Sequence, residues 1–280
     1  MRIICTDDIV KAVKEMCIES NYNLNYDIKN ALIRGLDDEE SPIGKDILKN
    51  ILKNSDISSD NRVPMCQDTG MIVAFVEIGQ EVFIEGNIKD AINEGVRQGY
   101  TDGFLRKSVV SDPIIRENTF DNTPAVIHYD FVEGDRLKIT IAPKGFGSEN
   151  MGKLKMLKPS DGIEGVKKFI LETVSEAGPN PCPPIVVGVG IGGTMDKVTE
   201  IAKKASIRPI DSFSETEYIK NLEEEMLEEI NKLGIGPQGL GGRVTALGVN
   251  VEVYPTHIAG LPVAVNINCH VARHMEMILW

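Results

Sequence analysis

The sequence has no long hydrophobic run and no excess of positive charge. It contains 280 residues with a formal net charge of −12. No stretch of about 18 apolar residues occurs, so we expect no membrane-spanning helix. The acidic balance argues against a general nucleic-acid-binding surface, because such surfaces gather Lys and Arg. The N-terminal residues MRIICTDD lack the layout of a secretory signal, and we therefore expect a cytoplasmic protein.

Cysteine is scarce and odd in number, with five in the whole chain. Such a set is not typical of a disulfide framework and instead indicates free, metal-bound or catalytic thiols. Internal repeats, low-complexity segments and flexible linkers are also lacking. We therefore expect a single domain over residues 1–280. It should have a helical N-terminal subregion (residues 1–60) and a mixed α/β region (residues 61–280) that holds the candidate metal-binding cysteines.

The spacing of apolar residues predicts an α+β fold, with mixed and antiparallel sheets, a helical N-terminal layer and surrounding helices. Helical spacing covers residues 6–58. A strand at 71–78 is followed by a short return strand at 82–84, and a hairpin is expected around residues 133–135. Further helices are expected at 87–103, 161–177 and 214–233, and further strands at 185–189, 244–254 and 261–267.

Three of the cysteines have polar or turn-forming neighbours. Cys66 precedes Gln-Asp-Thr-Gly, Cys182 is bracketed by prolines, and Cys269 follows Asn-Ile-Asn. Three thiolates would leave one iron of a cubic four-iron cluster without a protein ligand. An open iron can act as a Lewis acid on a substrate hydroxyl. The competing interpretations are a polar turn at Cys66 and a rigid proline connector at Cys182.

Two other kinds of site are compatible with the residues. Gly188–Gly193 matches the G-x-G-x-x-G pattern, which favours a dinucleotide site if a strand precedes it and a helix follows. An oxidoreductase using NAD is therefore one alternative. Cys269, His270 and His274 could instead form a zinc site in a non-catalytic scaffold, although the metalloprotease pattern is absent.

Five stretches together resemble the iron–sulfur-dependent class I fumarate hydratases and the related L-tartrate dehydratases, and in particular their alpha subunit. They occur in family order and cover most of the chain beyond residue 60. The stretches are VPMCQDTG (63–70), DGFLRKS (102–108), APKGFGSENMGKLKML (142–157), GPNPCPPIVVGVGIGGTMDK (178–197) and THIAGLPVAVNINCHVARH (256–274).

The resemblance implies a hydro-lyase that reversibly hydrates fumarate to malate, with L-tartrate dehydration as the alternative activity. It also implies a [4Fe-4S] cluster as cofactor and a small dicarboxylate as substrate. The residues that match family positions are Cys66, Cys182 and Cys269 as cluster ligands, Gln67, Arg106 and Gly147 as substrate-binding residues, and Asp68 and His257 as catalytic residues.

Single-chain members of the family continue into a second, C-terminal domain, which supplies further substrate-binding and proton-transfer groups. This sequence ends at Trp280, soon after the third cysteine. The resemblance therefore implies a separate beta subunit, a hetero-oligomeric enzyme and an active site at the subunit interface.

Overall fold

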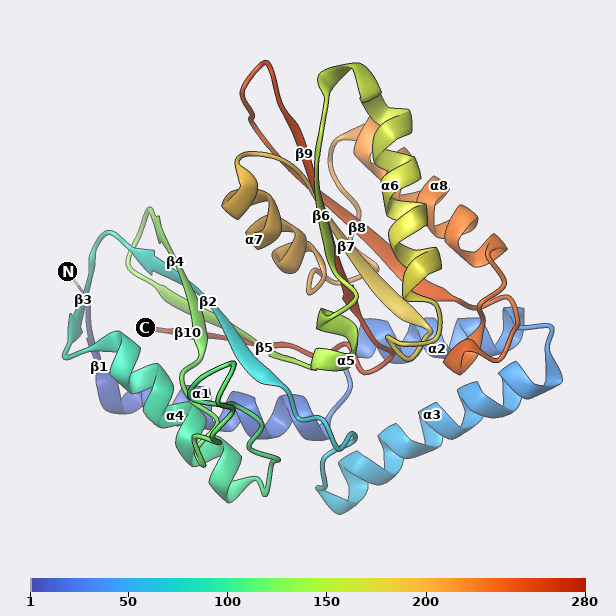
Figure 1. The fold of residues 1–280 in the computed structure, drawn as a ribbon. Helices are drawn as coiled ribbons and strands as arrows, with labels where there is room; N and C mark the ends of the chain where they lie inside the picture. Colours follow the sequence, from blue (N-terminus) through green and yellow to red (C-terminus); the bar gives the residue numbers. More distant parts are fainter. Residues whose placement is uncertain (1) are drawn as a thin grey trace. The chain divides into compact units, whose positions relative to one another are not determined.

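The computed structural model describes residues 2–280, and the chain forms two compact units (Figure 1). The first unit comprises Met1–Leu24, Ser55–Phe146 and Arg273–Trp280, and the second comprises Asn25–Asn54 and Gly147–Ala272. Two helices, α3 (Pro42–Asn61) and α5 (Phe146–Glu149), begin in one unit and end in the other. Among the described residues, no helix is long and apolar enough to cross a membrane.

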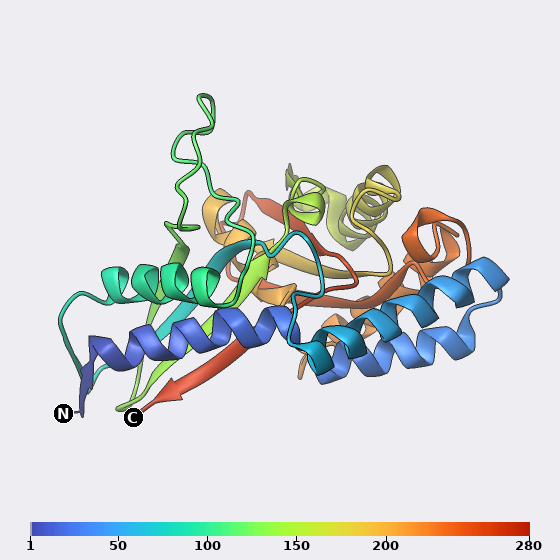
Figure 2. The ribbon, with the colours of Figure 1, turned by 90° about the horizontal axis from the view of Figure 1, so that it is seen from below.

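The first unit is built on a mixed sheet of four strands. Its elements are β1 (Arg2–Cys5), α1 (Thr6–Tyr22), β2 (Met71–Gly79), β3 (Val82–Glu85), α4 (Ile88–Asp102), β4 (Val126–Val132), β5 (Leu137–Lys144) and β10 (Met275–Leu279). The strand order is β10–β5–β2–β4. Helices α1 and α4 lie side by side and pack on this sheet (Figure 2). Ile9, Val13 and Met16 recur at helical spacing and are fully buried in the resulting core.

Two predicted strand pairings are wrong. The hairpin expected around residues 133–135 does not form, because β4 and β5 lie on opposite sides of β2, β4 parallel to it and β5 antiparallel. The strand at 82–84 does not return along β2 either, since β3 pairs in parallel with β1. Pairing between strands distant in sequence overrode the local turn signals.

The second unit is a sheet covered by helices on both faces. Its elements are α2 (Tyr26–Asp38), β6 (Lys153–Leu157), α6 (Gly162–Ala177), β7 (Ile185–Gly192), α7 (Met195–Ala205), α8 (Glu217–Lys232), β8 (Ala246–Tyr254) and β9 (Leu261–Asn268). The strand order is β6–β9–β7–β8. Helix α7 covers one face, and α6 and α8 cover the other (Figure 1). The α+β class with mixed sheets, a helical N-terminal layer and surrounding helices is confirmed.

The glycines of the G-x-G-x-x-G pattern serve close packing of a helix on a strand. Gly188 and Gly190 lie inside β7 and are paired with both neighbouring strands. A Cβ on Gly188 would stand 2.3 Å from the Ser206 nitrogen, and one on Gly190 would stand 2.3 Å from the Val198 oxygen. These glycines let α7 approach β7 and do not form a phosphate-binding loop, so the structure does not support the dinucleotide alternative.

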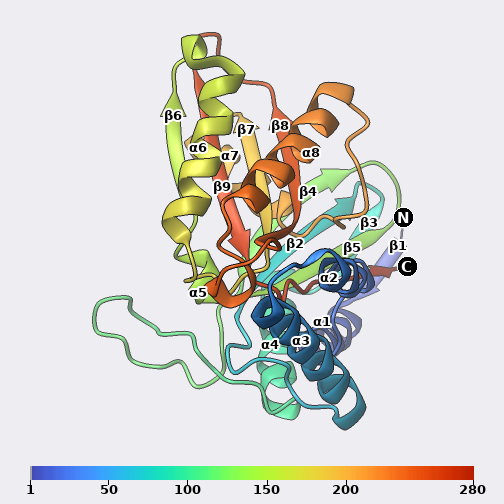
Figure 3. The same cartoon turned by 90° about the vertical axis from the view of Figure 1, so that its right-hand side faces the viewer.

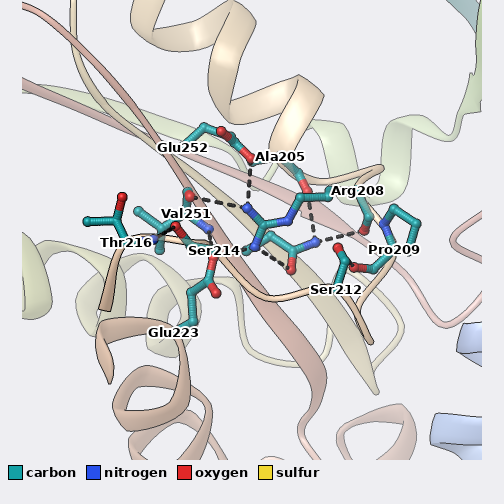
Figure 4. Close-up of polar contacts among 10 residues, drawn as sticks. Ala205, Arg208, Pro209, Ser212, Ser214, Thr216, Glu223, Val251 and Glu252 are labelled. Carbon is teal, nitrogen blue, oxygen red and sulfur yellow. Dashed lines mark hydrogen bonds and ion pairs between the residues drawn. The ribbon is translucent and has the colours of Figure 1, made fainter. Parts of the chain in front are cut away.

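A buried ion pair fixes the connection between α7 and α8. Arg208 extends toward Glu223 on α8 and Glu252 on β8 (Figure 4). The Arg208–Glu252 contact is 2.7 Å, and the Glu223 side chain is only 4% exposed. Glu223 also accepts the backbone N–H of Val251 at 2.8 Å. The arginine therefore neutralises a carboxylate that the fold has removed from water.

Arg208→Ala is expected to lower the free energy of unfolding by about 3 kcal/mol, because it leaves the buried Glu223 carboxylate without its cation. Lys220→Ala on the same helix is the matched control, since its contact with Glu224 is exposed and should contribute under about 1 kcal/mol. Urea unfolding of both variants measures the difference. Equal stability of the two variants would show that the Arg208 cluster does not hold the fold.

Candidate active site

The first unit presents Cys66 on the loop that joins α3 to β2. Cys66 is partly exposed, and its Sγ lies 3.6 Å from Oε1 of the exposed Gln67. The buried Tyr100 hydroxyl donates to the carbonyls of Thr69 at 2.6 Å and Gly70 at 2.9 Å. Burial raises the pKa of Tyr100 well above its ordinary value, so the phenol keeps its proton. These hydrogen bonds therefore attach the Cys66 loop to helix α4.

Asp68 holds the same loop against the end of β5. Its Oδ1 accepts the backbone N–H of Gly70 at 3.0 Å, and its Oδ2 accepts that of Phe146 at 2.9 Å. Its carbonyl accepts a bond from the buried Arg273 guanidinium at 2.5 Å. Each carboxylate oxygen keeps a further acceptor site for a ligand.

Arg106 lies on the long loop between α4 and β4, which extends as an irregular excursion in Figure 3. Its carbonyl accepts the Thr69 hydroxyl at 2.8 Å. The fully buried Asn122 ties the two loops together, since it accepts from the Ser108 N–H at 2.7 Å and donates to the Gly70 carbonyl at 3.1 Å. The structure thus brings the loops of Gln67, Asp68 and Arg106 together within the first unit, with the Arg106 side chain exposed.

The second unit presents Cys182 on the proline-rich loop between α6 and β7. Helix α6 ends at Ala177, and the following residue, Gly178, has a φ of +53°. Cys182 is exposed and has a φ of +55°, a conformation that few residues with a side chain adopt. Gly147 lies beside this loop, because a Cβ on it would stand 3.9 Å from the Asn180 oxygen.

Cys269 follows the last residue of β9 and lies beside the Cys182 loop. Asn268 pairs with Val186 at the start of β7, which places both cysteines at the same end of the sheet. The backbone N–H of His270 donates to the Cys182 carbonyl at 3.4 Å, and Nδ1 of His270 lies 2.9 Å from that oxygen. The structure therefore brings Gly147, Cys182 and Cys269 into one region of the second unit.

His257 lies at the other end of the same sheet. It follows β8, where the neighbouring Thr256 hydroxyl donates to Gly193 just beyond the end of β7. Its Nδ1 accepts the Ala259 N–H at 3.2 Å, and its side chain is exposed. Eight strand residues span about 26 Å, so the second unit does not bring His257 to its two cysteines. The catalytic role of His257 stays a prediction.

The cysteines differ in how well they suit a metal. None of the five forms a disulfide, and Cys66, Cys182 and Cys269 are all at least partly exposed. Cys17 is fully buried on α1, and burial raises the pKa of its thiol far above the ordinary value, so it stays a neutral core residue. Iron–sulfur clusters take cysteine thiolates as donors, and a thiol outside the apolar core ionises more readily than a buried one. The donor set of the three loop cysteines therefore fits such a cluster.

The residues of the zinc alternative are divided between the units, because Cys269 and His270 belong to the second and His274 to the first. Within residues 2–280, no three His, Cys, Asp or Glu side chains lie close enough together to hold a metal ion. His270 instead directs Nδ1 at the Cys182 carbonyl. The three loop cysteines are divided between the units, with Cys66 in the first and Cys182 and Cys269 in the second.

Glu39 is a structural residue of the second unit that sequence analysis did not identify. Its side chain is buried and accepts backbone N–H bonds of 2.8–3.0 Å from Glu40, Ser41, Arg243 and Val244. Burial raises the pKa of this carboxyl, but the four backbone hydrogen bonds outweigh burial and lower the pKa below its ordinary value. Glu39 thereby anchors the glycine-rich loop before β8.

Glu39→Gln is expected to cost about 2 kcal/mol of unfolding free energy at neutral pH, because an amide offers one acceptor atom in place of two charged ones. The native pKa is lowered, so the stabilisation is complete above the ordinary value of 4.5 and is lost as pH falls below it. The difference in unfolding free energy between wild type and Glu39→Gln should therefore become smaller in acid. Urea unfolding at several pH values measures it, with the exposed neighbour variant Glu40→Gln as control. A gap that does not change with pH would contradict this assignment.

The similarity to known proteins is extensive. A family model described as "Fumarate hydratase (Fumerase)" matches residues 10–278. A protein of Methanocaldococcus jannaschii named "Putative L(+)-tartrate dehydratase subunit alpha" is 46% identical over 272 residues, which cover 95% of this chain and 95% of that protein. The chain therefore belongs to the class I fumarate hydratase family of hydro-lyases.

More distant relatives carry the same kind of name. An Escherichia coli protein named "L(+)-tartrate dehydratase subunit alpha" is 34% identical over 250 residues, covering 88% of this chain and 82% of that protein. A Shigella sonnei protein of that name is 33% identical over 256 residues, covering 90% and 84%. Within the family, the chain is thus of the alpha-subunit type.

Proposed function

We propose that this chain is the cluster-binding alpha subunit of a hydro-lyase that dehydrates L(+)-tartrate. The observation that carries the proposal is the 46% identity, over nearly the whole of both chains, to a protein bearing the tartrate dehydratase name. Reversible hydration of fumarate to malate is the second candidate, favoured by the description of the family model. Both activities remove or add water at a small dicarboxylate.

Three thiolates are proposed to hold a [4Fe-4S] cluster, namely those of Cys66, Cys182 and Cys269. The accessibility of these cysteines and their irregular loops support this ligand set. A cluster held by three protein ligands would supply one iron as a Lewis acid for a hydroxyl group of the substrate. Cys5 and Cys17 take no part, and the burial of Cys17 supports this.

Three side chains of the first unit are proposed to bind the substrate: the exposed Gln67 and Arg106 and the half-buried Asp68. Arg106 can hold a carboxylate through two parallel N–H···O bonds, which a lysine cannot reproduce. Gln67 can donate and accept beside Cys66 and so orient a hydroxyl or carboxylate. Asp68 is our candidate for proton transfer at the neighbouring carbon, because its oxygens keep acceptor sites while the backbone fixes them.

Gly147 is proposed to contribute its backbone to substrate binding in the second unit. It is exposed, and the absence of a side chain leaves the backbone of α5 open to a ligand. A beta subunit is proposed as the partner, supported by the alpha-subunit names of the relatives. It would supply the remaining substrate-binding and proton-transfer groups.

Cys182→Ser, Cys66→Ser and Cys269→Ser are each expected to abolish cluster binding, because two thiolates hold a cubic cluster poorly. Anaerobic reconstitution should give the wild-type chain about four irons and a brown colour. Cys5→Ser is the control and should keep the cluster. Iron and sulfide analysis with visible absorption measures the outcome. Full iron content in any of the three loop variants would remove that cysteine from the ligand set.

With its beta subunit coexpressed, the anaerobic enzyme is expected to show a higher kcat/KM for L(+)-tartrate than for fumarate or malate. The alpha chain alone should be nearly inactive. Arg106→Lys should lower kcat/KM by roughly 100-fold, the value of a lost charged two-bond contact, and keep its iron. Lys107→Arg, at the adjoining position, is the control and should keep both the wild-type kcat/KM and the iron.

The reverse order of substrates would select fumarate hydration. Full turnover without a second polypeptide would refute the beta-subunit proposal. Loss of iron in Arg106→Lys would show that Arg106 supports the fold of the cluster loops and does not bind substrate.

A further inference from the structure

The loop around Pro237–Gly239 contacts Pro183, the residue after the candidate cluster ligand Cys182, through Gln238. Gln238 has a φ of +53°. Its backbone N–H donates to the Pro183 carbonyl at 2.7 Å, and its side-chain Nε2 donates to the same oxygen at 2.9 Å. Two donors of a single residue thus converge on the carbonyl that directly follows Cys182.

His270 contacts the preceding carbonyl, that of Cys182 itself. Its Nδ1 lies 2.9 Å from the Cys182 carbonyl oxygen and 3.1 Å from Nε2 of Gln238. One ring nitrogen cannot donate to the carbonyl and accept from the amide at once. A proton on Nδ1 satisfies the carbonyl and leaves the Gln238 amide bonded to Pro183, so we assign this tautomer. The carbonyls of Cys182 and Pro183 are then both fixed by side chains.

The turn that carries Gln238 is itself tightly held within the second unit. A Cβ on Gly239 would stand 2.2 Å from the Cβ of Pro179, so the two loops touch. The Gly236 N–H donates to the Thr245 hydroxyl at 3.1 Å. Beyond it, Glu39 accepts the N–H groups of Arg243 and Val244. These contacts therefore restrict the movement of the loop that carries Gln238.

Cys182 needs such support because of its backbone. The left-handed conformation costs a residue with a Cβ about 1 kcal/mol or more. Strained backbone persists where surrounding contacts determine it, and here donors from Gln238 and His270 act on two consecutive carbonyls. These contacts hold the backbone that carries the thiol before any metal binds.

We propose that Gln238 is a positioning residue for Cys182, acting with His270 through the backbone of the cysteine loop and without touching the cluster. The inference rests on the proposed function, because it takes Cys182 as a cluster ligand. A preorganised ligand loop loses less freedom on binding, so the cluster should be held longer. Cluster retention is therefore the property that depends on Gln238.

Gln238→Glu tests the proposal, because it keeps the size of the side chain and removes its N–H donors. In the reconstituted full-length chain, a chelator should remove iron about tenfold faster than from wild type, the value of one lost hydrogen bond, since the backbone N–H of residue 238 still donates to Pro183. Gln238→Ala should act likewise. Leu240→Ala is the control, since its exposed side chain lies on the same loop.

Hydrogen exchange of the metal-free chain gives a second readout, independent of iron. The segment covering residues 178–186 should exchange about tenfold faster in Gln238→Glu and unchanged in Leu240→Ala. Wild-type rates of both exchange and iron loss in Gln238→Glu would overturn the positioning role. A wild-type chain that takes up no iron would refute the proposed cluster, and with it the cluster role of Gln238. The hydrogen-exchange result would still show whether Gln238 orders the Cys182 loop.

Discussion

The structure depends on one constraint: irregular loops that approach the protein interior must still pair their backbone N–H and C=O groups. The loops that carry the candidate ligands have few strand or helix partners, so buried or half-buried side chains supply the bonds. Asp68, Tyr100 and Asn122 do this around the Cys66 loop. Glu39 and Gln238 do it in the second unit. Polar side chains thereby fix the backbone of the loops that carry Cys66, Arg106 and Cys182.

Except for Asp68, which is assigned both roles, the residues that hold the site differ from those proposed to perform the chemistry. The holding residues are mostly buried and direct their polar atoms at the backbone, whereas Gln67, Arg106 and Cys182 are exposed. Exposed groups on rigid loops can meet a substrate without a large loss of conformational freedom. Membership of the hydro-lyase family gives this division a chemical purpose, because a hydro-lyase must hold its substrate at fixed points while water is removed or added.

The strands and helices were predicted well where the periodicity was local. The helices of residues 6–58 and the buried strand at 185–189 follow from apolar spacing alone. Pairing was predicted poorly, since β2 inserts between β4 and β5 and β3 joins β1. The glycines at 188–193 illustrate the same difficulty, because one pattern suits both a phosphate loop and a strand packed closely by a helix.

The sequence by itself determined the family, the exposed motif loops and the residues that match the family positions, because these depend on residue type and order. The tertiary structure alone decided which loops share a region: Arg106 joins Asp68 in the first unit, and Cys182 joins Cys269 in the second. It also revealed Gln238 and Glu39, whose roles are hydrogen bonds to backbone far away in the chain. Such bonds leave no periodic or compositional trace, because any loop of the right shape can receive them.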